Sequence, residues 1–378
     1  MKLSNVIFFL MVLFLFDVSI FGQTENNLEQ NNSGRALLVG SSTVSGGIYG
    51  ITFQSIFGIT GDRALVGTYF LSTAAGFATS FGMTHKKNVP LPAATLAVGG
   101  QILGYQDGLA LSLLLSPNIE DGPDAKILTS LGMASSIGQT ILGYRYVQKN
   151  NLTLGRTSLI NMGHLWGLGY GVGWSYLFGF PERSGEGAIR GTGATIFLSS
   201  MAGMAAGAFL MSDKHYTNGD AIVIQTMGMI GGYLPIGFVQ LADPDDSKLY
   251  TATSMFTSMA GLGFGLHQLP KQNFTSSQGT LISLGAAVSG LFALGTTYVI
   301  GNNNTESSTY LITSGLGTVA GFVGMYKLFS NKKKEEENNK VGYHFQIYPQ
   351  HFLNKTNKEM TKQNLENAMP LASLNLTF

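Results

Sequence analysis

Residues 274–295 read FTSSQGTLISLGAAVSGLFALG, and this stretch decides which kind of protein the chain can be. It contains no Asp, Glu, Lys or Arg, and its apolar residues do not alternate with polar ones as they do in a half-buried β-strand. A helix of about 20 such residues is long enough to cross the hydrocarbon layer of a membrane. The stretch therefore predicts an apolar helix of membrane-spanning length.

Segments of the same kind follow one another through the body of the chain, separated by short polar connectors such as PERSGEG at 181–187. The charge-free segments are 157–181, 191–212, 221–242, 249–270, 272–305 and 307–326. Short connectors between consecutive helices favour antiparallel neighbours. We therefore expect residues 34–330 to form an all-α bundle of about ten transmembrane-type helices in antiparallel hairpins.

These segments also resemble one another, which predicts that the bundle is built from an internal repeat. LTLGRTSLINMG at 152–163 aligns without a gap with FTSSQGTLISLG at 274–285. Similar motifs, with two apolar residues before a small or amide polar residue and a glycine, end at Gly132, Gly228 and Gly315. A spacing of about 30 residues corresponds to one helix and one turn per unit.

Glycines spaced four residues apart follow the motif, so each set lies along one face of a helix. Such faces allow the backbones of two membrane helices to approach closely. In water, mid-helix glycines would cost about 0.8–1.0 kcal/mol each relative to alanine, so close packing or a bilayer must offset them. We predict a glycine-zippered bundle. The predicted helix-packing residues are Gly163, Gly167, Gly171, Gly203, Gly207, Gly228, Gly232, Gly261, Gly265, Gly317 and Gly321.

The composition excludes several classes of protein. Only 11% of the 378 residues are charged, where a soluble globular chain carries about 25%. A formal net charge of +1 leaves no cationic excess for binding nucleic acid. The absence of cysteine excludes disulfides and thiolate metal sites. Membrane lipid is the expected partner, with other envelope proteins or a second copy of the chain as further partners.

The two ends of the chain differ from the body. Residues 1–22 combine one lysine with an apolar run, as a secretory signal peptide does, and a polar segment follows at 23–33. A charged linker is expected at 331–342. Residues 343–378 contain two alternating runs, which predict a small strand pair. The final run, LASLNLTF at 371–378, resembles the last strand of bacterial outer-membrane proteins, so an outer-membrane β-barrel is an alternative to the helical bundle.

Four polar residues are candidates for a polar path through the membrane: Gln101, Asp107, Gln139 and Arg145. They occupy matching places in two segments that share the pattern GQ(T)ILGY. In the interior of a membrane such groups would mark a route for ions or polar solutes. Near the ends of helices they would be interfacial residues, and we favour this second placement.

Two further groups have a structural and a functional interpretation. His164 and Trp166 could contact a ligand, but we favour a packed or interfacial aromatic pair. The DPDD sequence at 243–246 could bind a cation, but we favour a turn in which an aspartate caps the next helix.

The chain lacks the motifs of familiar enzymes. It contains no GxGxxG, no GxxxxGK[ST] and no GxSxG, and its histidines form no HxxxH pair. We therefore expect no enzyme activity, no catalytic residues, no cofactor and no metal site.

The function expected from these features is that of a structural or scaffold component of a bacterial cell envelope. A transporter or pore with a path lined by Ser, Thr, Asn and Gln is the alternative, but the charge-free segments contain no ionisable residue at mid-membrane. A mean hydropathy of +0.18 is low for an inner-membrane protein, so we favour the outer membrane. The connectors show no strong Lys/Arg asymmetry from which an orientation follows.

Overall fold

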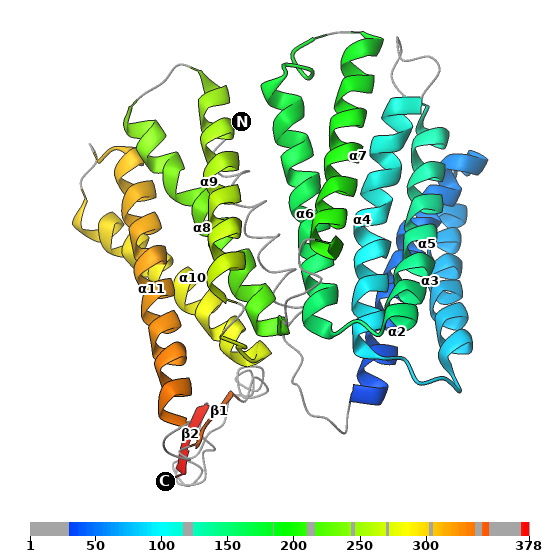
Figure 1. Cartoon of the computed structure of the whole chain (residues 1–378). Coiled ribbons are helices and arrows are strands. Elements are labelled where there is room, and N and C mark those ends of the chain that lie inside the picture. Colours follow the sequence, from blue (N-terminus) through cyan, green and yellow to red (C-terminus); the bar gives the residue numbers. More distant parts are fainter. Residues whose placement is uncertain are drawn as a thin grey trace, which may run out of the picture. The chain divides into compact units, whose positions relative to one another are not determined.

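The computed structural model describes most of the body of the chain. The described residues are 30–115, 124–183, 185–209, 216–242, 246–269, 272–301, 305–336, 342–347 and 372–377. The predicted signal peptide at 1–22 lies outside them. The chain divides into two units, residues 1–325 and 326–378. Within the described residues, the first unit is entirely helical (Figure 1).

The described body contains ten helices, which confirms the all-α prediction and leaves no strand there for a β-barrel. The helices are α2 (Gln30–Phe57), α3 (Asp62–Thr84), α4 (Leu91–Leu115), α5 (Ala125–Asn150), α6 (Leu154–Leu177), α7 (Glu186–Phe209), α8 (Asn218–Leu241), α9 (Ser247–Gln268), α10 (Ser276–Ile300) and α11 (Ser307–Glu336). The shortest has 22 residues, which corresponds to a length of about 33 Å.

Local sequence determines where several of these helices begin. Thr153, Thr217 and Thr275 cap α6, α8 and α10, each accepting a hydrogen bond from a backbone N–H of the first helical turn. Asp124 caps α5 in the same way. Asp246 caps α9 by accepting from the N–H of Lys248, as expected for the DPDD turn; Asp243 and Asp245 lie outside the described residues.

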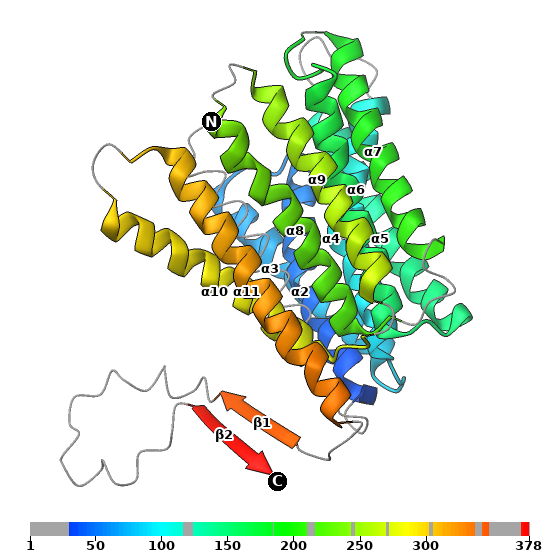
Figure 2. The same ribbon diagram turned by 60° about the vertical axis from the view of Figure 1, so that its left-hand side comes forward.

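The helices pack as a row of hairpins. Consecutive helices form the closest pairs, α2–α3, α4–α5, α6–α7 and α8–α9. Neighbouring hairpins touch through their first helices, in the order α2, α4, α6, α8, α10, and through diagonal contacts α2–α5, α4–α7 and α6–α9. Figures 1 and 2 show α4 between α2 and α6. This places α4 against four helices, α2, α5, α6 and α7.

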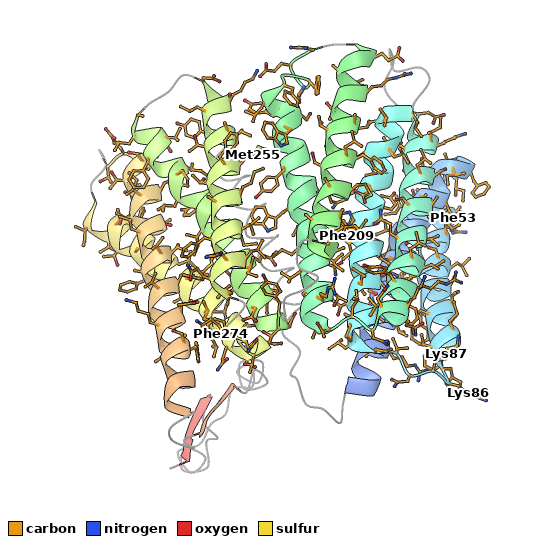
Figure 3. All side chains as sticks on the ribbon, in the orientation of Figure 1. Phe53, Lys86, Lys87, Phe209, Met255 and Phe274 are labelled. Atoms are coloured by element: carbon orange, nitrogen blue, oxygen red, sulfur yellow. The ribbon has the colours of Figure 1, made fainter. Side chains whose placement is uncertain are left out.

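Apolar side chains point outward and many polar ones inward. Phe292 and Val299 on α10 are 76% and 81% exposed, whereas Asp107 on α4 is completely buried. Many other apolar side chains cover the outside of the helices (Figure 3). Six of the helices are long and apolar enough to cross a membrane. An outward apolar surface of this size fits lipid rather than water, so the helices point to a membrane protein.

Glycines bring α6 and α7 into backbone contact. A Cβ built on Gly163 would lie 2.3 Å from the carbonyl oxygen of Gly203, and one built on Gly203 would lie 2.1 Å from that of Gly163. Gly167, Gly171 and Gly207 face the partner helix in the same way. The other predicted packing glycines lie between α8 and α9 or between α10 and α11: Gly228, Gly232, Gly261, Gly265, Gly317 and Gly321. Only Gly232 has room for a Cβ at ordinary contact distance, 3.5 Å.

The second unit contains β1 (Gly342–Ile347) and β2 (Ala372–Thr377). They pair antiparallel, with Gly342 opposite Thr377 and Ile347 opposite Ala372. The small C-terminal strand pair expected from the sequence remains a prediction.

Candidate functional site

Four polar side chains from four helices meet in the interior of the bundle. We call Asp107 (α4), Gln139 (α5), His164 (α6) and Ser200 (α7) the polar centre. Ser200 Oγ donates to Asp107 Oδ1 at 2.5 Å, and Gln139 Nε2 donates to Asp107 Oδ2 at 2.6 Å. His164 Nε2 lies 2.7 Å from the same Oδ2. The carboxylate of Asp107 therefore joins the other three side chains.

The polar centre is deep in the bundle and shielded from solvent. Asp107 and Ser200 are fully buried, and His164 is 2% exposed. At a rise of about 1.5 Å per residue, Asp107 lies roughly 24 Å from the first residue of α4 and roughly 12 Å from its last. The other three lie at least about 13 Å from either end of their helices. In a membrane these positions are within the hydrocarbon layer.

Asp107 stands apart from the other charged residues of the helical body. Over residues 34–325, every other Asp, Glu, Lys and Arg in the described part lies in a connector or within about one and a half turns of a helix end, whereas Asp107 is more than two turns from either end of α4. Positions near a helix end allow a charged group to reach the membrane surface. Asp107 has no such route, and a charge in the hydrocarbon layer is costly unless it is paired and hydrogen-bonded.

The same place in the other hairpins is occupied by a tyrosine. Three diagonal helix pairs are joined by a hydrogen bond between a tyrosine and a serine: Tyr49–Ser136 (2.7 Å), Tyr170–Ser258 (3.0 Å) and Tyr233–Ser314 (2.8 Å). These bonds join α2 to α5, α6 to α9 and α8 to α11. The fourth diagonal pair, α4 and α7, is joined by Asp107 and Ser200 instead. A carboxylate thus replaces a phenol at one of four corresponding positions.

Gln139, like Asp107, differs from the residues at the corresponding places in the other hairpins. It lies three residues after Ser136, and the residues three after Ser200, Ser258 and Ser314 are all glycines. All three glycines, Gly203, Gly261 and Gly317, face a backbone carbonyl of a neighbouring helix. On α5 a side chain extends from this position to Asp107 instead, passing Gly104 of α4, where a built Cβ would lie 3.0–3.1 Å from it.

Further polar groups surround the polar centre on the side of α2. Gln101 Nε2 donates to Ser42 Oγ at 2.9 Å, and Ser136 Oγ donates to the carbonyl oxygen of Gln101 at 2.5 Å. The side-chain oxygens Oε1 of Gln101 and Gln139 are buried, and each accepts no hydrogen bond within the described part of the chain. Unsatisfied acceptors in a buried site can receive a proton donor.

The sequence-predicted polar residues are therefore only partly brought together. Asp107 and Gln139 are in direct contact, and Gln101 is buried nearby, so the interfacial placement is wrong for these residues. The helices extend well beyond the shared GQ(T)ILGY pattern at both ends, so these residues lie in the interior of α4 and α5 and not at their ends. Arg145 is exposed on α5, near its C-terminal end.

His164 and Trp166 do not form the expected pair. The imidazole of His164 is hydrogen-bonded to Asp107, while the ring of Trp166 packs against Tyr170 with a centroid distance of 5.6 Å. His164 is therefore packed in the interior, but its partner is Asp107 and not Trp166.

The polar centre contains Ser, His and Asp but does not have the order of a hydrolytic triad. In a triad the histidine accepts the proton of the serine and the aspartate orients the histidine. Here Ser200 and His164 both bond to Asp107. The arrangement therefore joins the carboxylate directly to both the imidazole and the hydroxyl, and within the described residues no hydrogen bond joins Ser200 to His164.

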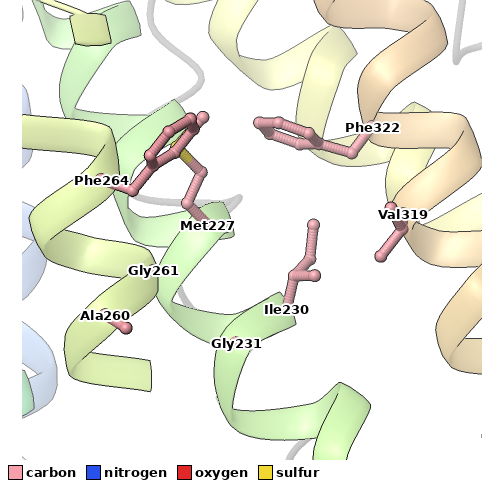
Figure 4. A pocket seen from close by; sticks show the side chains of 8 residues that line it. All are labelled: Met227, Ile230, Gly231, Ala260, Gly261, Phe264, Val319 and Phe322. Carbon is pink, nitrogen blue, oxygen red and sulfur yellow. The ribbon is translucent and has the colours of Figure 1, made fainter. Parts of the chain in front are cut away.

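An apolar recess of about 320 Å³ lies between α8, α9 and α11 (Figure 4). Its lining consists of Met227, Ile230, Gly231, Ala260, Gly261, Phe264, Val319 and Phe322. No polar side chain is among these residues, so the recess offers nothing to orient or activate a substrate. The polar centre is the stronger candidate site.

Comparison with known proteins found no match to the chain among protein-family models, curated proteins or solved structures. The function must therefore be inferred from the polar centre and its surroundings.

Proposed function

We propose that the protein moves protons across a membrane, using Asp107 and His164 as the groups that hold the proton in transit. The proposal rests on one observation: a fully buried carboxylate lies 2.7 Å from an imidazole, in the middle of two helices of an apolar bundle. Ionisable pairs at such a depth are costly and are typical of ion and proton pathways. This favours the transport alternative over a scaffold.

The chemistry of the pair fits proton transfer. His164 Nε2 lies 2.7 Å from Asp107 Oδ2, so a proton can pass directly between the imidazole and the carboxylate along this hydrogen bond. Gln139 and Ser200 donate to the carboxylate and keep it in place while the proton moves. The unsatisfied oxygens of Gln101 and Gln139 can accept a hydrogen bond from a hydrated proton that approaches the pair.

A proton carrier acts in a membrane that maintains a proton gradient. The proposal therefore favours the bacterial inner membrane over the outer membrane that the low mean hydropathy favoured. The six helices that are both long and apolar enough to cross a membrane are compatible with this placement, and α7, which contains Ser200, is one of them.

The test is proton uptake by liposomes that contain the purified full chain and a pH-sensitive dye. Uptake is driven by a potassium diffusion potential set with valinomycin. We expect faster uptake than in protein-free liposomes, and at least a tenfold loss of rate for Asp107→Asn, whose amide cannot carry the proton. Tyr170→Phe, which removes the corresponding hydroxyl at the α6–α9 contact, should retain the wild-type rate. Equal uptake by wild-type and protein-free liposomes would contradict the proposal.

A scaffold remains the second candidate function, and one feature favours it. The last hairpin, α10–α11, presents large exposed apolar side chains such as Phe292 and Tyr298, which a partner helix could cover. If Asp107→Asn leaves both proton uptake and the cellular role unchanged, the scaffold is the better explanation.

A further inference from the structure

The helix bounds show which connectors lie at the same end of the bundle. Because consecutive helices are antiparallel, the connectors that precede even-numbered helices share one end, and those that precede odd-numbered helices share the other. Figure 3 labels Lys86 and Lys87, before α4, and Phe274, before α10, and all three lie at the lower end of the view. We call this end the basic end and the opposite one the acidic end.

The basic end has a net positive charge in the described part of the first unit. Its cationic residues there, in the connectors or in the adjacent helix turns, are Arg35, Lys86, Lys87, Arg145, Lys149 and Arg156. The described carboxylate there, Asp220, is buried and accepts hydrogen bonds from the backbone N–H groups of Thr217 and Phe274. The carboxylate of Asp220 therefore forms its hydrogen bonds inside the fold and does not reach the surface. The exposed charged groups of this surface include Lys86, Lys87 and Lys149.

The acidic end is rich in carboxylates but also contains cations. Its described carboxylates are Asp62, Asp124, Glu182, Glu186, Asp246 and Glu306, and all six are exposed. Its described cations are Arg63, Lys126, Arg183, Arg190 and Lys248, of which Arg190 is paired with Glu186, and Lys248 with Glu182 at 3.0 Å. The two ends therefore have similar numbers of cations, as expected from the connectors, and differ in net charge because exposed carboxylates offset the cations at the acidic end only.

We infer that the protein lies in its membrane with the basic end at the cytoplasmic face, where Lys86, Lys87 and Lys149 contact anionic lipid headgroups. The cytoplasmic leaflet is rich in anionic lipid and attracts basic residues next to the membrane. This inference does not depend on proton transport.

The chain contains no cysteine, so single cysteines can report the orientation without background labelling. His85→Cys and Thr60→Cys place exposed probes in the connectors at the two ends of α3. Both variants leave every lysine in place. The full chain is expressed in bacterial cells and treated with a membrane-impermeant maleimide before and after permeabilisation.

We expect Thr60→Cys to be labelled in intact cells and His85→Cys only after permeabilisation. The reverse pattern, or equal labelling of both probes in intact cells, would overturn the inference. Gln268→Cys and Ala242→Cys form a second pair at the two ends of α9, and they replace the first pair if either variant fails to fold. In this pair we expect Ala242→Cys to be labelled first. As a check on the lysines, Lys86→Glu with Lys87→Glu should raise labelling of His85→Cys in intact cells at least threefold.

Discussion

Ser200 on α7 donates a hydrogen bond to Asp107 on α4 at 2.5 Å, at the place where a serine meets a tyrosine in the three corresponding helix pairs. The tyrosine–serine contacts are neutral, and each joins two hairpins by one hydrogen bond. The aspartate brings a titratable group and two additional partners, Gln139 and His164. The contact between α4 and α7 therefore contains a carboxylate, which the three tyrosine–serine contacts lack.

The first prediction concerns a double variant in which the polar centre is replaced by the residues found at the α6–α9 contact. Asp107→Tyr with Gln139→Gly reproduces the set formed by Tyr170, Ser258 and Gly261. Because the set already packs between α6 and α9, we expect the double variant to fold, at a cost in unfolding free energy of no more than about 3 kcal/mol from overpacking. Proton uptake by liposomes should fall to the protein-free level. A double variant that retains the wild-type rate shows that Asp107 serves only to join the helices.

The second prediction concerns stability. Asp107→Ala removes the acceptor for Ser200, Gln139 and His164 and should lower the unfolding free energy by about 3–5 kcal/mol, as when one partner of a buried pair is removed. The double substitution Asp107→Leu with His164→Leu replaces both partners and leaves no unpaired charge in the interior. It should lower the unfolding free energy much less than Asp107→Ala does. Reversible unfolding in mixed detergent micelles measures both. Equal losses for the two variants would show that the pair is not coupled.

The third prediction isolates the neutral contacts. Tyr170→Phe removes the hydrogen bond to Ser258 and should lower the unfolding free energy by about 0.5–1.5 kcal/mol. The same micelle assay measures this loss. A loss as large as that of Asp107→Ala would indicate that the tyrosine contacts and the polar centre are energetically equivalent.

The helical body could be predicted because its signal is local. A charge-free segment of about 20 residues has few alternatives to an apolar helix, and polar connectors indicate where it ends. The fold of residues 34–330 follows from these segments. The partners of Asp107 do not, because His164 and Ser200 lie 57 and 93 residues away and meet it only after α4 packs on α6 and α7.

A charge-free segment is a poor indicator of α4 as a membrane helix, because Asp107 interrupts the apolar sequence of this helix. The special place of Asp107 is visible when the hairpins are compared with one another. Asp107–Gly108 aligns with Tyr49–Gly50 and Tyr170–Gly171, and the sequence Ser-x-x-Gly recurs on α7, α9 and α11 with Gln139 as the exception on α5.

The last prediction compares two glycines of the same helix, Gly163 and Gly169 on α6. A Cβ at Gly163 would lie 2.3 Å from the carbonyl oxygen of Gly203, and backbone cannot move aside without separating α6 from α7. Gly163→Ala should therefore lower the unfolding free energy by about 1–3 kcal/mol. Gly169 has no atom within 4 Å of a built Cβ, so Gly169→Ala should be neutral or stabilising by up to about 1 kcal/mol.

The pair separates close packing from helix propensity, because both substitutions add the same methyl group to the same helix. If backbone contact holds α6 against α7, only the first variant loses stability, and a cross-link between α6 and α7 should restore part of it. If both variants gain stability, the α6–α7 interface accommodates the added methyl group without losing unfolding free energy. In that case Gly163 is not needed for close packing. The unfolding free energy in mixed micelles distinguishes these results, since the difference expected between the variants exceeds about 1 kcal/mol.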